Sequence, residues 1–121
     1  MAKINYSRLS TALVAAKAAA KAAKDFRKLF TKDYDFDGGT CNFDSVIFYG
    51  KGLREKAVMA AAAEAGVAVF KSRLRGSMAY FVSDIYEGQA ALQSVMMRAA
   101  LEAMKENAPE GIDVGGYYAM D

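Results

Sequence analysis

The sequence predicts one α+β domain, in which a long N-terminal helix precedes four strands and two further helices. Three observations lead to this fold class. The chain has 121 residues and 54% hydrophobic content, enough for one modest core. Residues 10–31 are rich in alanine and lysine, which favour helix. After residue 45, short apolar runs alternate with helical segments. We therefore expect a single domain over residues 1–121, made of a basic helix (1–32), an acidic glycine loop (33–44) and a folded unit (45–121).

The N-terminal helix is expected over residues 10–31, with Ser7 or Ser10 as its cap. At 100° per residue its lysines form one basic stripe: Lys17, Lys21, Lys24 and Lys28. A small-residue face falls roughly opposite, at Ala15, Ala19, Ala22 and Phe26. Leu9 and Leu13 project nearer to the lysines. We therefore expect either a bend near Ser10 or a contact of the first turns with another chain, as in a homodimer through this helix.

The remaining elements follow from pattern and turn residues. We expect strands at 45–49, 67–71, 77–83 and 112–120, helices at 53–65 and about 88–106, and a hairpin loop at 72–76. Gly66 is the expected C-terminal cap of the helix at 53–65. The order strand, helix, strand, strand, helix, strand is that of a ferredoxin-like unit with a four-stranded antiparallel sheet. Its own helices cover one face, which leaves the N-terminal helix free to cover the other face or to mediate assembly.

The composition argues against several classes of function. The chain has no His, so the usual general base near neutral pH and the commonest zinc ligand are missing. The single Cys41 lies in an acidic loop, which disfavours the thiolate that a nucleophile needs. We therefore expect no enzyme. One cysteine forms no internal disulfide, which suits the cytoplasm. No apolar run reaches the roughly 18 residues of a membrane span.

The loop at 33–44 has the spacing of a twelve-residue calcium loop. Counted from Asp33, acidic residues stand at positions 1, 3, 5 and 12, namely Asp33, Asp35, Asp37 and Asp44, with Gly38 at position 6. Position 12 is Asp instead of the usual bidentate Glu, and a strand follows instead of a helix. The alternative interpretation is a solvated acidic loop, and no other cofactor is expected.

Basic residues are expected to gather at one end of the sheet. The first strand's end, the following helix's start and the hairpin meet there, which brings together Lys51, Arg54, Lys71, Arg73 and Arg75. Exposed backbone N–H groups near Gly50 and Gly52 would add to an anion site for nucleic acid or a nucleotide. The alternative is ordinary surface decoration.

Charge is divided unevenly along the chain. Residues 1–32 contain eight basic residues and one acidic residue, a net +7, so the other 89 residues carry −5 of the total +2. A basic arm on an acidic body is typical of proteins that bind nucleic acid or an acidic partner, yet the arm can equally pack on its own body.

Aromatic side chains are concentrated on the expected strands: Phe48, Tyr49, Phe70, Tyr80, Phe81, Tyr117 and Tyr118. Rings on an open sheet face can stack on bases, as in RNA-binding domains. Alternation sends about half of them into the core, and the rest could lie under the N-terminal helix, so we favour core. The seven methionines mildly favour a surface that adapts to a protein partner or a second copy.

The segment DGGTCNFD, residues 37–44, resembles a segment of small uncharacterised proteins from bacterial phages and mobile elements. The resemblance implies an accessory protein of the bacterial host cytoplasm, such as an inhibitor of a CRISPR nuclease. The sequence as a whole thus predicts a non-catalytic binding or inhibitory protein with a protein or nucleoprotein partner. A nucleic-acid or nucleotide-binding module is the first alternative, and a calcium-binding module is the second.

Overall fold

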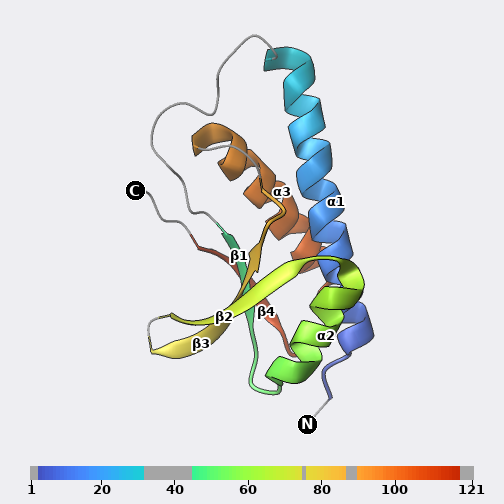
Figure 1. Cartoon of the computed structure of the whole chain (residues 1–121), viewed down its shortest axis with the longest axis vertical. Coiled ribbons are helices and arrows are strands. Elements are labelled where there is room, and N and C mark those ends of the chain that lie inside the picture. The colour runs from blue at the N-terminus through green and yellow to red at the C-terminus, as the bar shows by residue number, and fades with distance from the viewer. Residues whose placement is uncertain (1–2, 32–44, 75, 87–89, 118–121) are drawn as a thin grey trace.

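The computed structural model describes residues 3–31, 45–74, 76–86 and 90–117 (Figure 1). The elements follow in the order α1 (Tyr6–Thr31), β1 (Ser45–Tyr49), α2 (Glu55–Ala65), β2 (Ala68–Leu74), β3 (Ser77–Ser83), α3 (Ala90–Asn107) and β4 (Asp113–Tyr117). The mixed fold with a long N-terminal helix and four strands is confirmed.

The four strands form one antiparallel sheet in the order β2-β3-β1-β4. β3 therefore lies between β1 and β2, although β1 and β2 are the strands joined through α2. Pairing of Ile47 with both Phe81 and Gly115 sets the register across the three strands on that side. Because successive side chains alternate, Val46 and Phe48 face one side of the sheet and Ile47 and Tyr49 face the other.

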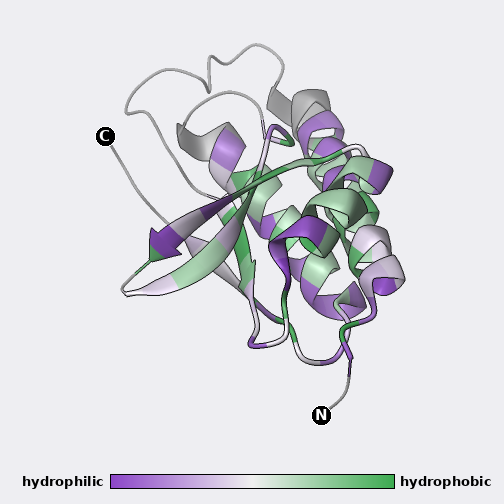
Figure 2. Cartoon of the chain, turned by 60° about the horizontal axis from the view of Figure 1, so that its bottom comes forward, coloured by the Kyte–Doolittle hydropathy of each residue, from purple (hydrophilic) through white to green (hydrophobic). Residues whose placement is uncertain are grey.

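All three helices lie on the same side of the sheet (Figure 1). α1 packs against α3 and α2 and makes no comparable contact with the strands. The expectation that α1 could cover the opposite sheet face is therefore wrong. The reason is that α2 and α3 leave apolar side chains uncovered on their outer side, and the apolar side of α1 buries them. Hydrophobic residues lie between these helices (Figure 2).

The buried side of α1 is neither of the faces expected from the sequence. Leu9 and Leu13 are fully buried, and they continue into a line of small residues made of Ala12, Ala16 and Ala20. This line runs between the lysine stripe and the opposite alanines, of which Ala22 is exposed. One continuous helix uses the whole line, so neither a bend near Ser10 nor a second chain is needed to bury the leucines.

Local signals account for several element ends. Gly66 caps α2 in the left-handed conformation, with φ of 71°, as expected. α1 begins earlier than expected, because the side-chain oxygen of Asn5 accepts a hydrogen bond of 3.0 Å from the backbone N–H of Arg8. β2 also continues to Leu74, through residues expected to form the hairpin loop, since its pairing with β3 extends to Ser77.

The core lies between the helices and the sheet. Its largest fully buried side chains come from every layer and include Leu9 and Leu13 from α1, Phe48 from β1 and Met96, Met97 and Met104 from α3. Three of the methionines therefore fill the core. The rings of Phe48 and Tyr80 stack at 5.3 Å between centroids on this side.

Candidate functional site

The side of the sheet opposite α1, α2 and α3, here named the helix-free face, carries a second and smaller apolar cluster. Ile47, Ala79 and Phe81 form its buried floor, and Leu74 and Tyr117 pack against it. Around this floor, Phe70 is 48% exposed and Tyr49 is 43% exposed. Large aromatic side chains are therefore accessible on a face that no described helix covers.

The rings on this face are ordered by their neighbours. Phe70 on β2 stacks on Phe81 on β3, with centroids 5.1 Å apart and an angle of 7° between planes. Phe81 meets Tyr117 on β4 edge to face, at 5.3 Å and 74°. These contacts link three strands into one aromatic row and hold the rings in fixed positions. About half of the strand aromatics thus lie outside the main core, as alternation requires.

A hollow of about 610 Å³ opens on this face, and we name it the Gly115 hollow. Its floor includes Gly115 and Ile47, and Tyr49 and Tyr117 both line it. Leu74, Ser77, Met78, Ala79 and Gly116 complete its lining. The volume is in the range of sites that bind small molecules or anchor a partner's side chain.

A second hollow of about 370 Å³ lies beside the aromatic row. Phe70, Phe81 and Tyr117 line it, together with Asp84, Tyr86 and Gln93 of α3. Asp84 adopts a positive φ of 57°, and its carboxylate accepts a hydrogen bond of 3.3 Å from the backbone N–H of Ala68. The hydroxyl of Tyr86 accepts a hydrogen bond of 2.8 Å from Val46 N–H, and burial raises the pKa of Tyr86.

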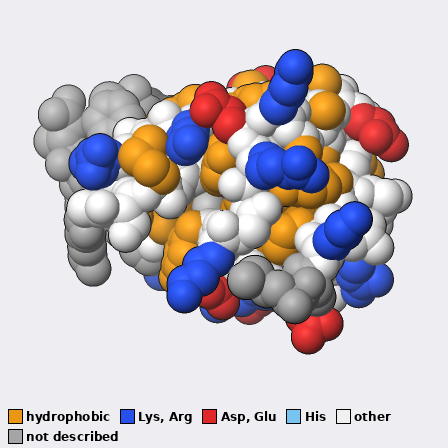
Figure 3. Space-filling view, turned by 90° about the horizontal axis from the view of Figure 1, so that it is seen from below, with side chains coloured by type: hydrophobic (Ala, Val, Ile, Leu, Met, Phe, Trp, Pro, Cys, Tyr) orange, Lys and Arg blue, Asp and Glu red, His pale blue; other side chains and the backbone are white. Residues whose placement is uncertain are grey.

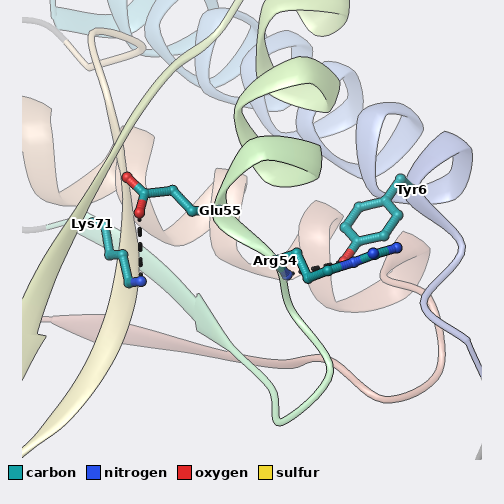
Figure 4. A network of polar contacts seen from close by, with 4 residues as sticks. All are labelled: Tyr6, Arg54, Glu55 and Lys71. Carbon is teal, nitrogen blue, oxygen red and sulfur yellow. Dashed lines mark hydrogen bonds and ion pairs between the residues drawn. The ribbon is translucent and has the colours of Figure 1, made fainter.

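Of the basic residues expected at one end of the sheet, Lys71 and Arg73 belong to β2. Lys71 pairs in register with Tyr80, and its ammonium lies 3.5 Å from the Glu55 carboxylate at the start of α2. Arg73, two residues further on, is exposed and pairs with Met78. Figure 4 shows Lys71 reaching Glu55, and Arg54 beside Tyr6. The ion pair offsets part of the positive charge that the sequence predicts here.

Lys51 and Arg54 are exposed next to the start of α2. The view from below shows Lys and Arg side chains spread over this end of the molecule, with apolar side chains between them (Figure 3). The Tyr6 hydroxyl joins α1 to this loop, since it donates to the Gly52 carbonyl at 3.3 Å and accepts from Arg54 N–H at 3.1 Å. Arg75 lies outside the described residues.

The lysine stripe of α1 borders a groove of about 420 Å³. Lys17, Lys21 and Lys24 line it together with Asp25 and Asp84. Lys17 donates a hydrogen bond of 3.0 Å to the carbonyl of Gly66, at the C-terminus of α2, where a cation is favourable. The stripe is therefore partly used to hold α1 against α2. The side chain of Lys28 lies outside the described part of the chain.

The calcium-loop residues Asp33, Asp35, Asp37 and Asp44 lie outside the described residues, as do Cys41 and Tyr118. Calcium binding therefore stays a prediction. Within the described ranges, no group of three or more Cys, Asp or Glu residues is placed to hold a metal ion.

Sequence reasoning missed three residues of this region, namely Gly115, Tyr6 and Tyr86. Glycine inside a strand often marks the close approach of a ligand or another backbone, so the Gly115-Gly116 pair was a usable signal. The two tyrosines act through contacts with residues 40 or more positions away, and no local pattern identifies such partners.

Among the described helices, none is both long and apolar enough to cross a bilayer. Comparison of the chain with protein-family models, with curated proteins and with solved structures gives no match.

Proposed function

We propose that this chain is a small non-catalytic binding protein that docks a protein or nucleoprotein partner on its helix-free face. The observation that carries the proposal is the aromatic row of Phe70, Phe81 and Tyr117, with exposed rings at its border and two adjoining hollows. Aromatic anchors beside pockets are typical of the central part of protein interfaces.

The charge on this face also supports a protein partner. By register, the outward positions of β1 to β4 on the helix-free face include no Lys or Arg among the described residues. A sheet that binds single-stranded nucleic acid combines aromatic rings with positive charge along the phosphate backbone. The described strand positions of this face have the rings without the positive charge. A protein surface is therefore the better fit.

Inhibition of a bacterial defence nuclease in the host cytoplasm is the most specific form of this proposal. It rests on the resemblance of residues 37–44 to phage and mobile-element proteins. The helix-free face is compatible with this role but does not by itself indicate it.

We also propose a ferredoxin-like arrangement for residues 45–117. Its support is the βαββαβ order of the elements and the position of β3 between β1 and β2, which splits the first βαβ unit. In such an arrangement the helices share one face, so the opposite face is available to a partner.

The second candidate function is nucleic-acid binding at the basic end formed by Lys51, Arg54 and Arg73. The spread of Lys and Arg side chains in Figure 3 favours it. The variant Lys51→Glu/Arg73→Glu should then lose most affinity for a short oligonucleotide, and affinity of the unmodified protein should fall steeply with salt. Affinity that is indifferent to salt would count against this candidate.

A homodimer through α1 is a further proposal, restricted to outward residues such as Val14 and Phe26, which are 49% and 64% exposed. The inward side of α1 is already buried within the chain. Sedimentation over a range of protein concentrations tests this assembly, and a monomer at all of them would reject it.

Photo-crosslinking tests the main proposal directly. A benzoylphenylalanine residue is placed at Phe70 on the helix-free face and, as a matched control, at exposed Ala63 on α2. We expect a defined partner to be captured from position 70 only, and the purified partner to bind Phe70→Ala at least about tenfold more weakly. Equal capture from both positions, or capture from position 63 alone, would reject the helix-free face as the binding surface.

A further inference from the structure

The packing around Gly115 leaves room for a side chain, so glycine is not required there by the fold. A Cβ atom built there would meet Ile47 Cγ1 at 4.0 Å, which is an ordinary van der Waals contact. Its φ lies outside the left-handed region, so other residues could adopt the same backbone. Glycine nevertheless weakens a strand, and its presence inside one often marks the approach of a ligand. The space above Gly115 is the Gly115 hollow.

Tyrosines from two strands line this space. Tyr49 ends β1 and Tyr117 ends β4, and both belong to the same hollow as Gly115. Tyr117 is also held by its edge contact with Phe81. Two aromatic rings beside a floor without a side chain suit a flat group that stacks, which a planar guanidinium does well.

Among the described outward strand positions of the helix-free face, the charged side chain is that of Asp113. Asp113 pairs with Tyr49 in register, so it lies on this face beside the Gly115 hollow, and it is exposed. Asp84 lines the neighbouring hollow and also the groove bordered by Lys17, Lys21 and Lys24. Lys71 pairs with Tyr80, which places it on the helix-covered side, whereas exposed Arg73 pairs with Met78, which also lines the Gly115 hollow. The described part of the face therefore combines aromatic rings with the carboxylate of Asp113, which complements a cation.

We propose that the helix-free face recognises a basic segment of its partner protein, and that the Gly115 hollow seats an arginine side chain of that segment. The guanidinium stacks on Tyr49, and its charge is met by Asp113, which is opposite Tyr49 in the register. This inference rests on the proposed function and names the chemistry of the partner. Arginine is also enriched among the side chains that contribute most to protein interfaces.

The test is an NMR titration of the full chain with a capped Gly-Arg-Gly-Arg-Gly peptide. Matched peptides carry lysine or glutamate in place of arginine, and a short oligothymidylate represents nucleic acid. We expect amide shifts confined to residues around Ile47, Tyr49, Gly115 and Tyr117. We also expect the arginine peptide to bind at least about fivefold more tightly than the lysine peptide, because guanidinium stacks better.

Variants separate the hollow from general charge attraction. Gly115→Val fills the space with a good strand former, and Asp113→Asn removes the acidic partner. Each should weaken arginine-peptide binding about fivefold or more, whereas Ala63→Val on α2 should leave it unchanged. Tyr49→Ala, at an exposed position, gives a second test of the hollow that does not depend on how Gly115→Val folds.

Three results would overturn the inference. The first is the absence of localised amide shifts. The second is a lysine peptide that binds as tightly as the arginine peptide and keeps that affinity in Gly115→Val, and the third is tighter binding of the oligothymidylate than of the arginine peptide. Failure of the arginine peptide together with capture of a partner from position 70 leaves the proposed function intact and rejects the arginine site alone. Loss of position-specific capture rejects the proposed function itself.

Discussion

Tyr86 illustrates how a single side chain connects parts of the chain that are far apart. Its hydroxyl accepts a hydrogen bond from the N–H of Val46, 40 residues earlier, and so ties the segment after β3 to the beginning of β1. The same ring lines the second hollow, between the aromatic row and Gln93 of α3. A residue that appears in the sequence as one more aromatic therefore positions both the sheet and the candidate site.

Removal of the Tyr86 hydroxyl should destabilise the protein. In Tyr86→Phe the Val46 N–H loses its partner, which should lower the free energy of unfolding by about 1–3 kcal/mol. The effect should also depend on pH. Burial raises the pKa of Tyr86 above its ordinary value of 10.0, so the folded state keeps the neutral form. The stability that comes from keeping Tyr86 neutral in the folded state is complete below the ordinary pKa of tyrosine. It is lost as the pH rises above that value, because Tyr86 ionises first in the unfolded chain.

Urea unfolding measured from neutral pH to about pH 11 tests both the loss of stability in Tyr86→Phe and its pH dependence. The slope of the unfolding free energy against pH reports how many protons are released on unfolding. The unmodified protein should lose stability more steeply than Tyr86→Phe above the ordinary tyrosine pKa. Identical slopes would show that Tyr86 ionises equally easily in both states.

At the scale of elements, the packing of α1 against α2 and α3 depends on small residues as well as on its leucines. Ala12, Ala16 and Ala20 have no exposed surface, and they allow α1 to approach α2 and α3 closely. High alanine content predicted the helix from local propensity. It did not predict which alanines would face the core, because several helical faces are equally small, and packing against α2 and α3 selects one of them.

The substitution Ala16→Leu should reveal this close approach. Adding bulk between α1 and its neighbours should cost about 1–3 kcal/mol of stability, because the packed helices must separate or the leucine must adopt a strained rotamer. Ala22→Leu places the same side chain on an exposed position of the same helix and should change stability by less than about 0.5 kcal/mol. Denaturant midpoints compare the two variants. Equal effects would mean that α1 does not pack closely at Ala16.

For the whole molecule, the important feature is that α1 belongs to the domain instead of forming a separate basic arm. Leu9 and Leu13 share one core with Phe48 of the sheet and Met104 of α3. Lys17 and Tyr6 add polar links from α1 to the two ends of α2. One of the lysines that the sequence assigns to a basic arm, Lys17, is therefore used to hold α1 on the rest of the domain.

The chain should consequently unfold in one cooperative transition. A fluorophore at Thr11→Cys, in a Cys41→Ser background, reports on the exposed side of α1, and far-ultraviolet circular dichroism reports on the whole chain. The two denaturation curves should coincide, as expected for a two-state domain. An earlier transition of the α1 probe would show that this helix docks only weakly on the body.

The sequence by itself determined the types and order of the elements, and it placed Gly66 at the end of α2 and the strands at 45–49 and 77–83 correctly. These features depend on propensity, alternation and capping, which act over a few neighbouring residues. Only the tertiary structure decided that α1 joins the other helices, that Lys71 turns toward Glu55, and that Gly115 lies between two tyrosines. Those arrangements depend on contacts between distant segments, where packing chooses among faces that the local pattern leaves equivalent.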